Sequence, residues 1–322
     1  MEYKIAWFTE GGWEGKVLRN HPNMRNDMAW MNVLDVVHHP IVHLPNIKND
    51  EYDIGIITIP KTNIEQLMQV SIIKELKRVC KKIGTMQEGP HWYFQDYTME
   101  QQIWFYNILA ELDFVWCHNE IDKKYYEGLT SKKCYVNPTL MLEDQIISNI
   151  VRTEERSGVI IGGNMCRWYG GFDSYIVAQI FGQDVYAPSM GRKIDREDEM
   201  DINHLPYMTW VEWINNLSKY KYGVHLMPTW AAGTFTLNCA YHGIPCIGYK
   251  GLDTQEQLHP SLSVDYGDLH MARKLAKKLK KDVSFYDKCS DECKTIYKNS
   301  YFTENKYIYI IKDILNKVML ND

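Results

Sequence analysis

The stretch with the clearest chemical meaning runs from Tyr222 to Pro245, YGVHLMPTWAAGTFTLNCAYHGIP. A strand-like apolar run leads into a turn, and Gly233 and Thr234 then open a segment with a helical pattern. The first turn of a helix offers N–H groups without a partner inside the helix and the positive end of the helix dipole, which suits a phosphate. Taken alone, the pattern also describes any ordinary strand-to-helix connection.

Two cationic residues follow other predicted strands. Arg167 comes shortly after Ile160-Ile161-Gly162-Gly163, and Lys250 directly follows the run Cys246–Tyr249. A guanidinium can hold two phosphate oxygens at once, and a fixed positive charge stabilises an anionic ligand. We therefore predict Arg167, and after it Lys250, as phosphate ligands. The alternative for Arg167 is a surface residue on a loop.

A second group of titratable residues lies in the first half of the chain, in Met86–Asp96. Glu88, His91 and Asp96 follow a predicted strand and stand beside several aromatic residues. A reaction at a hydroxyl group can need a base that takes its proton, and these three residues are the candidates for that base. The alternative is that a carboxylate caps the next helix and that His91 is structural.

Glycines follow the first predicted strand as Gly11 and Gly12, where missing side chains let the backbone approach a ligand closely. A tight turn explains the pair equally well. His38, His39 and His43 lie close in sequence but lack a carboxylate or Cys complement at metal spacing. We interpret them as structural and predict no metal.

Short apolar runs alternate with helical stretches along the whole chain, as is typical of parallel sheets covered by helices. A polar stretch at 143–156 separates two such halves, which gives an N-terminal domain 1–150 and a C-terminal domain 151–302. Expected strands include Tyr3–Phe8, Ile41–Leu44, Asp53–Ile59, Ile83–Met86, Phe114–Cys117, Val159–Ile161, Gly223–Met227 and Cys246–Tyr249. Expected helices include Asn26–Val36, Ile64–Lys82, Met99–Leu112, Thr209–Tyr220, Thr234–His242, Tyr286–Asn299 and Glu304–Leu320.

Composition narrows the class of protein. The net charge of -5 gives no overall positive field for nucleic acid or anionic lipid, and the basic runs 74–82 and 273–281 are expected to be solvated helix faces. The eight cysteines form no CxxC pair. The sequence shows no signal peptide and no apolar stretch long enough to span a membrane. We therefore expect a cytoplasmic protein with reduced thiols.

The order of motifs in the second half resembles that of GT-B glycosyltransferases, in particular the bacterial glycan-building (family 4-like) class. That class has a strand followed by Gly and R-x-x-G, a loop that reads the donor base, a P-S/T turn before a Gly-bearing helix start, an A-x-x-G-x-P close and a V-D-x-x-D segment. The matching residues here are Ile160–Gly163, Arg167–Gly171, Leu205–Met208, Pro228-Thr229, Gly233, Ala240–Pro245 and Val264–Asp268. The resemblance covers about 155–300.

The resemblance implies an α/β GT-B fold with two Rossmann-like, doubly wound domains facing across a cleft, and a terminal helix 303–322 that packs back on the first. It implies that Tyr207 and Met208 contact the donor base. The two glutamates of the class are absent, and Trp230 and Asn238 stand at their positions. Trp230 is then expected to stack on the sugar, and Asn238 to bind ribose hydroxyls.

The resulting hypothesis is a hexosyl- or pentosyltransferase that uses a nucleotide-sugar donor, expected to be UDP-linked, and no further cofactor. Its acceptor is either a glycan or a hydroxymethylated base in phage-type DNA. One alternative is a nucleotide-sugar epimerase of GT-B fold. The other is a non-catalytic sugar-binding or scaffold protein, and the missing glutamates favour this second alternative. A dinucleotide oxidoreductase is disfavoured because no GxGxxG follows a strand.

Overall fold

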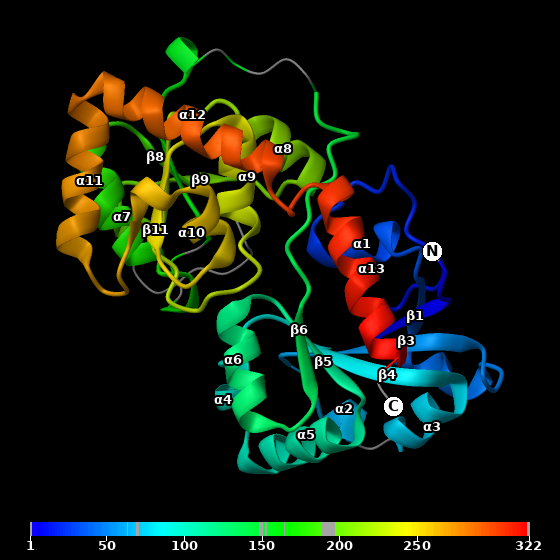
Figure 1. Ribbon diagram of the computed structural model, residues 1–322. Coiled ribbons are helices and arrows are strands. Elements are labelled where there is room, and N and C mark those ends of the chain that lie inside the picture. The colour runs from blue at the N-terminus through cyan, green and yellow to red at the C-terminus, as the bar shows by residue number, and fades with distance from the viewer. Residues whose placement is uncertain are drawn as a thin grey trace. The chain divides into compact units, whose positions relative to one another are not determined.

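The computed structural model describes residues 2–62, 64–68, 71–147, 151, 153–163, 165, 167–188 and 197–320. The chain forms two compact units, which Figure 1 shows by colour along the chain. Unit 1 comprises Met1–His21, Asn26–Leu140 and Glu304–Asp322, and unit 2 comprises Pro22–Arg25 and Met141–Thr303. The terminal helix therefore belongs to the first unit.

Unit 1 is built on a six-stranded parallel sheet with the order β2-β1-β3-β4-β5-β6. Its strands are β1 (Ile5–Thr9), β2 (Val37–Pro40), β3 (Tyr52–Ile59), β4 (Cys80–Gln87), β5 (Phe114–Cys117) and β6 (Lys133–Val136). Its helices are α1 (Asn26–Val33), the 3-10 helix η1 (Ile41–Asn46), α2 (Glu65–Met68), α3 (Ile72–Val79), α4 (Tyr93–Asp96), α5 (Met99–Glu111), α6 (Glu120–Leu129) and α13 (Glu304–Leu320). Figure 1 shows α1 and α13 on one face of this sheet and α2, α3 and α5 on the other.

The two faces of the sheet follow from the alternation of side chains along β1. Phe8 faces the core under α3 and α5, while Trp7 faces the opposite side. The Trp7 ring stacks on the rings of Trp30 and Trp116, with centroids 6.3 and 5.8 Å away. The Trp7 indole N–H donates to Thr58 Oγ1 at 2.7 Å, so the buried polar group is satisfied.

Unit 2 is built on a second parallel sheet, with the order β12-β11-β10-β7-β8-β9. Its strands are β7 (Val159–Ile161), β8 (Val185–Pro188), β9 (Asn203–Leu205), β10 (Tyr222–His225), β11 (Cys246–Tyr249) and β12 (Ser263–Val264). Its helices are α7 (Gly171–Ala178), α8 (Trp210–Leu217), α9 (Thr234–His242), α10 (Asp253–Leu258), α11 (Leu269–Lys281) and α12 (Val283–Asn299), with 3-10 turns η2 (Thr153–Glu155), η3 (Arg167–Tyr169), η4 (Gln179–Phe181), η5 (Glu197–Glu199) and η6 (Pro260–Leu262).

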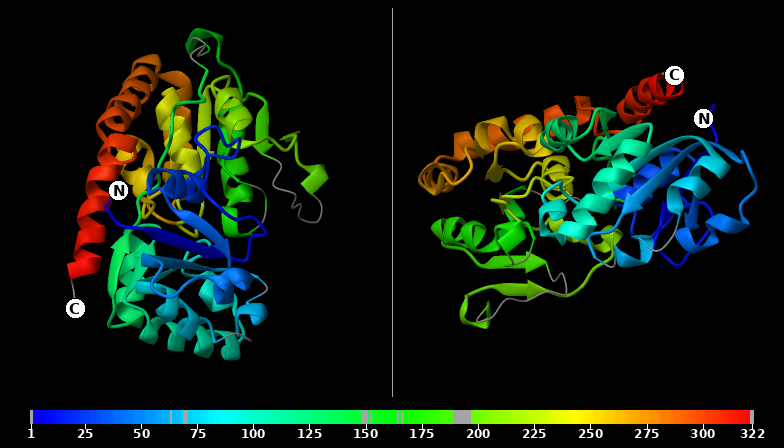
Figure 2. Two further views of the ribbon diagram at one scale, coloured as in Figure 1. Left: turned by 90° about the vertical axis from the view of Figure 1, so that its right-hand side faces the viewer. Right: turned by 90° about the horizontal axis from the view of Figure 1, so that it is seen from below.

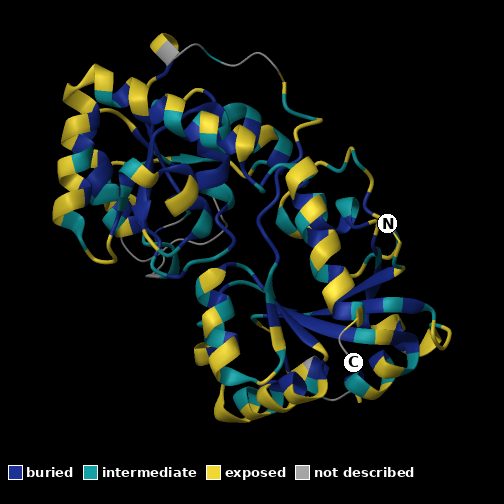
Figure 3. Ribbon diagram, viewed as in Figure 1, coloured by how far each residue is buried: buried dark blue, intermediate teal, exposed yellow. Residues whose placement is uncertain are grey.

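Helices flank each sheet, as the further views in Figure 2 show. In unit 2, α7 packs against α11, while α8, α10 and α12 pack around α9. The strands of both sheets are buried and the outer faces of the helices are exposed (Figure 3). None of the helices that the structure describes has the length and apolar content needed to cross a membrane.

Two expected elements of unit 1 are wrong. The segment expected as a strand at Ile41–Leu44 is the 3-10 helix η1, and the strand is Val37–Pro40, which pairs with β1. The single helix expected at Ile64–Lys82 is two helices, α2 and α3, of which the second ends at Val79, and β4 begins at the next residue. The first residues of β4 were assigned to the helix because Lys81 and Lys82 have the polarity of an exposed helix face. In the strand, the ammonium group of Lys81 lies 2.7 Å from a carboxylate oxygen of Asp53, and that of Lys82 lies 3.7 Å from one of Asp113.

Candidate active site

Every strand of each sheet runs in the same direction, so the loops that follow the strands meet at one edge of that sheet. In unit 2, this carboxyl edge carries the donor-side residues predicted from the sequence. Gly162 follows β7, Tyr207 and Met208 follow β9, Trp230 and Gly233 follow β10, and Lys250 follows β11.

Gly170 brings the loop after β7 against the loop after β10. Its φ is +60°, and a Cβ at this position would lie 1.8 Å from the carbonyl oxygen of Leu226. Only glycine fits such a contact without displacing backbone. The neighbouring Thr229 hydroxyl donates to the carbonyl of Trp168 at 2.8 Å. The backbone of Arg167, the first residue of η3, is thereby held beside the β10 loop.

The start of α9 is also defined by a glycine. Gly233 has a φ of +77°, and a Cβ there would lie 2.0 Å from the Thr254 hydroxyl oxygen. The hydroxyls of Thr236 and Thr254 both donate to the Gly233 carbonyl at 3.0 Å. These bonds fix the first turn of a nine-residue helix that begins at Thr234, as the sequence predicted. Its N–H groups and dipole point out of this end of the helix.

Trp230 adopts a backbone conformation that is rare for a bulky side chain, with a φ of +42°. Its indole N–H donates to the carbonyl of Lys250 at 2.7 Å, and its ring lies 5.9 Å from that of Tyr266. Tyr266 is 65% exposed. Strained residues of this kind cluster at functional sites, where the surrounding structure holds them. The pair forms an aromatic surface that the sequence indicated only at Trp230.

The other predicted donor ligands differ in how accessible their side chains are. The Lys250 ammonium lies 2.8 Å from Asp265 Oδ1, and this partner raises the pKa of the lysine. Asn238 is fully buried, and its amide nitrogen lies 3.1 Å from Met141 Sδ. Tyr207 is 68% exposed. The side chain of Arg167 lies outside the described part of the structure. The roles given to these residues remain predictions, and that of Asn238 requires its amide to become accessible.

His225 is a residue of this edge that sequence analysis missed. It ends β10 and is buried, and burial lowers its pKa to about 4, so the ring is neutral at physiological pH. Within the described residues, its Nδ1 has no hydrogen-bond partner. Gly162 makes room for it, since a Cβ there would lie 2.4 Å from the His225 ring.

In unit 1, the carboxyl edge joins charges from three strands. Glu88 follows β4, and its Oε1 lies 3.3 Å from the Lys61 ammonium, which follows β3. Glu10 follows β1, and its pKa is raised by partial burial and by the charge of Glu88, against an opposite effect of Lys61. Sequence analysis missed Glu10, although it directly precedes Gly11. The Gly11 N–H donates to the Thr9 hydroxyl at 2.9 Å.

His91 is the best positioned of the three predicted bases. Its Nδ1 lies 2.6 Å from Asp122 Oδ1, which also accepts the backbone N–H of His91 at 3.0 Å. The imidazole stacks on Tyr125 with centroids 4.4 Å apart and is 12% exposed. In the region that the structure describes, Nε2 has no hydrogen-bond partner. An ordered imidazole with one nitrogen held and the other available is suited to accept a proton.

Asp122 holds this imidazole and was also missed. It lies in the first turn of α6, 1% exposed, where the helix dipole favours a negative charge. Its backbone N–H donates to the capping Asn119 side chain at 2.9 Å. Asp96, in contrast, is the exposed last residue of α4. Gly12 has open space at its Cβ position, with no described atom within 4 Å, so nothing there requires glycine.

The described residues contain no group of three or more His, Cys, Asp or Glu side chains placed to hold a metal. Among the described residues, two of the predicted base candidates have different partners: Glu88 pairs with Lys61, while His91 pairs with Asp122.

Two parallel six-stranded sheets flanked by helices, together with the likeness to the solved structures below, show a GT-B fold. No protein-family model and no curated protein sequence matches the chain. Among solved structures, it is similar to HepE from Anabaena in complex with UDP-glucose, with a TM-score of 0.70 and 11% identity over 98% of this chain and 100% of that one. It is also similar to sucrose-phosphate synthase from Thermosynechococcus elongatus, with a TM-score of 0.61 and 10% identity over 84% and 75% of the two chains. A trehalose-6-phosphate synthase that transfers glycosyl groups with retention gives a TM-score of 0.63 and 11% identity over 97% and 93%.

Proposed function

We propose that this protein is a glycosyltransferase that moves a hexosyl or pentosyl group from a nucleotide sugar to an acceptor hydroxyl. The GT-B fold supports the class, and the His91–Asp122 pair carries the catalytic claim, because a scaffold has no need of a positioned imidazole with an available nitrogen. UDP is the proposed leaving group, since structures similar in fold contain UDP or UDP-glucose. The acceptor is proposed to be a glycan or a hydroxymethylated base in DNA.

In the proposed reaction, the bond between the anomeric carbon and the β-phosphate oxygen breaks, and a bond to the acceptor oxygen forms. The acceptor proton passes to Nε2 of His91, and Asp122 stabilises the resulting imidazolium. The departing diphosphate gains negative charge, which the α9 N-terminus and Arg167 are proposed to stabilise.

The aromatic surface of Trp230 and Tyr266 is the proposed platform for the donor sugar. It replaces one of the absent glutamates by an apolar ring face, and the hydrogen bond to the Lys250 carbonyl holds this ring in position. Tyr207 and Met208 are proposed to contact the donor base from the loop after β9.

The test is release of nucleoside diphosphate across a panel of UDP-, GDP-, ADP- and TDP-linked sugars, with and without glycan or hydroxymethylated DNA acceptors. Release with one donor, lost in His91→Ala, supports a transferase. Conversion of the sugar without release indicates an epimerase, and binding without either reaction indicates a sugar-binding protein. The latter two outcomes contradict the proposal.

A further inference from the structure

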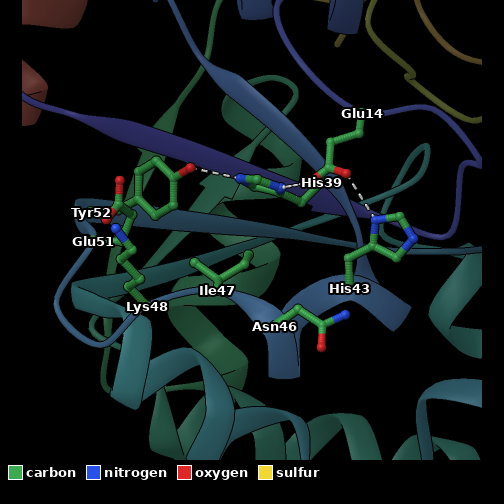
Figure 4. A pocket seen from close by; sticks show the side chains of 8 residues that line it. All are labelled: Glu14, His39, His43, Asn46, Ile47, Lys48, Glu51 and Tyr52. Atoms are coloured by element: carbon green, nitrogen blue, oxygen red, sulfur yellow. Dashed lines mark hydrogen bonds and ion pairs between the residues drawn. The ribbon is translucent and has the colours of Figure 1, made fainter.

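A pocket of about 490 Å³ lies in unit 1 (Figure 4), and none of the residues assigned above to catalysis lines it. Its wall comes from the loop after β1, from β2, from η1 and from the start of β3. The volume lies in the range of small-ligand sites. The proposed function uses none of its side chains.

A chain of hydrogen bonds shapes the pocket wall. His39 Nε2 lies 2.6 Å from the Tyr52 hydroxyl, and His39 Nδ1 lies 2.5 Å from Glu14 Oε1. The second carboxylate oxygen of Glu14 lies 3.0 Å from His43 Nδ1. Tyr52 and His39 are buried, while Glu14 and His43 are each 46% exposed, so the chain leads from the core to solvent. Figure 4 shows these side chains side by side along one wall.

Other groups of the pocket are available to a ligand. Asn46 is exposed, and within the described ranges its side chain makes no hydrogen bond. Among the same residues, His43 Nε2 has no partner either. Ile47 adds an apolar surface to the pocket wall. An amide, an imidazole and a carboxylate beside an aliphatic side chain can each exchange hydrogen bonds with hydroxyl groups, which both donate and accept.

The charges of the pocket favour a neutral occupant over a strongly ionic one. Glu51 pairs with Lys4, which leaves the Glu14 carboxylate and the Lys48 ammonium as its remaining full charges. A phosphate chain would be attracted by the Lys48 ammonium but repelled by the Glu14 carboxylate. A cation would be attracted by Glu14 but repelled by Lys48. The balance favours a neutral ligand rich in hydroxyl groups.

We propose that this pocket binds a neutral sugar residue of a glycan acceptor. The inference rests on the proposed function, because it places the glycan beside the loop that carries Glu10. Glu14 follows Glu10, a residue of the carboxyl edge, by four positions in that loop, so their Cα atoms lie at most ~14 Å apart. A short oligosaccharide can therefore contact the pocket with one residue while another lies at the carboxyl edge. The proposal therefore favours a glycan over a hydroxymethylated DNA base as the acceptor.

The experiment is calorimetric titration of the full chain with three neutral trisaccharides, built of glucose, galactose and N-acetylglucosamine. We expect one of them to bind, and Asn46→Ala and His43→Ala each to weaken its Kd roughly 3- to 10-fold, as for loss of one hydrogen bond. His270→Ala, an exposed histidine of α11, is the matched control and should leave Kd unchanged. The same variants should release diphosphate from the donor at the wild-type rate without acceptor.

Three results would overturn the proposal. They are no binding of any trisaccharide at millimolar concentration, trisaccharide binding that neither pocket variant weakens, and binding of a hydroxymethylated oligonucleotide that both pocket variants weaken. Failure of the proposed function is recorded separately, as absence of diphosphate release. Variant-sensitive trisaccharide binding without such release supports the pocket as a sugar site while rejecting the transferase.

Discussion

Replacing Asp122 by Asn tests whether the His91–Asp122 pair does the proposed chemistry. The substitution keeps an oxygen that can accept the Nδ1–H at the observed 2.6 Å but removes the negative charge. A hydrogen bond to a charged group contributes about 1.5–3 kcal/mol. If the variant loses this contribution to the stability of the imidazolium in the transition state, kcat decreases roughly 10- to 150-fold. The Kd for the donor should not change, because the charge acts only when the acceptor proton is transferred.

The assay compares single-turnover transfer rates and donor Kd for wild type, Asp122→Asn and Glu127→Gln. Glu127 lies on the same helix, is 50% exposed and has a distant partner in Lys123 at 3.9 Å, so its variant controls for a change of charge on α6. A thermal melt of each protein separates loss of chemistry from loss of folding. Wild-type kcat in Asp122→Asn, or an equal loss in Glu127→Gln, would refute the assignment of His91 as the base.

Further predictions concern the anomeric configuration of the product, the backbone at Gly170, the KM for the donor and the dependence of stability on pH. Because a base acts in a single displacement, the product should have the inverted anomeric configuration by NMR, and a retained configuration would limit His91 to hydrogen bonding. Gly170→Ala should destabilise the protein by at least ~2 kcal/mol in chemical denaturation, since its Cβ would meet the Leu226 carbonyl 1.8 Å away at a φ of +60°; unchanged stability would contradict the described loop. Trp230→Ala should raise the donor KM about 3- to 10-fold with folding intact, and an unchanged KM would exclude the aromatic platform. The pKa of His225 is lowered to about 4 from 6.5, so the unfolded chain binds more protons between these values. Stability is then fully present above pH about 6.5 and falls toward pH 4, by roughly 2–3 kcal/mol for this group, and His225→Asn should flatten that dependence in pH-resolved melts.

Local patterns predicted much of the fold. The helix at Thr234–His242 and the strands at Phe114–Cys117 and Val159–Ile161 have the expected limits. The hydrophobic period, and the glycines that flank the runs at Thr234–His242 and Val159–Ile161, are properties of neighbouring residues, so they can be recognised without tertiary information. The error at Ile41–Leu44 arose because a short, mostly apolar run fits a strand or a 3-10 helix equally well. The strand that pairs with β1 is formed by the four residues before this run.

The candidate site was predictable in part, for the same reason. Gly233 and His91 were singled out because each follows a recognisable strand. Asp122 was not, since it lies 31 positions from His91 in the sequence and meets it only because β4 and β5 are parallel neighbours. Glu14 and His39 meet in the same way across β1 and β2.

The sequence by itself determined the alternation of strands and helices, the division into two α/β halves and the glycine-bounded start of α9. These depend on short-range sterics and hydrogen bonding along the chain. Only the tertiary structure decided that Asn238 is buried, that Trp230 takes a positive φ beside Lys250, and that a carboxylate faces the imidazole of His91. Those features depend on which strand ends become neighbours, and sheet order is set by packing between segments that are distant in the sequence.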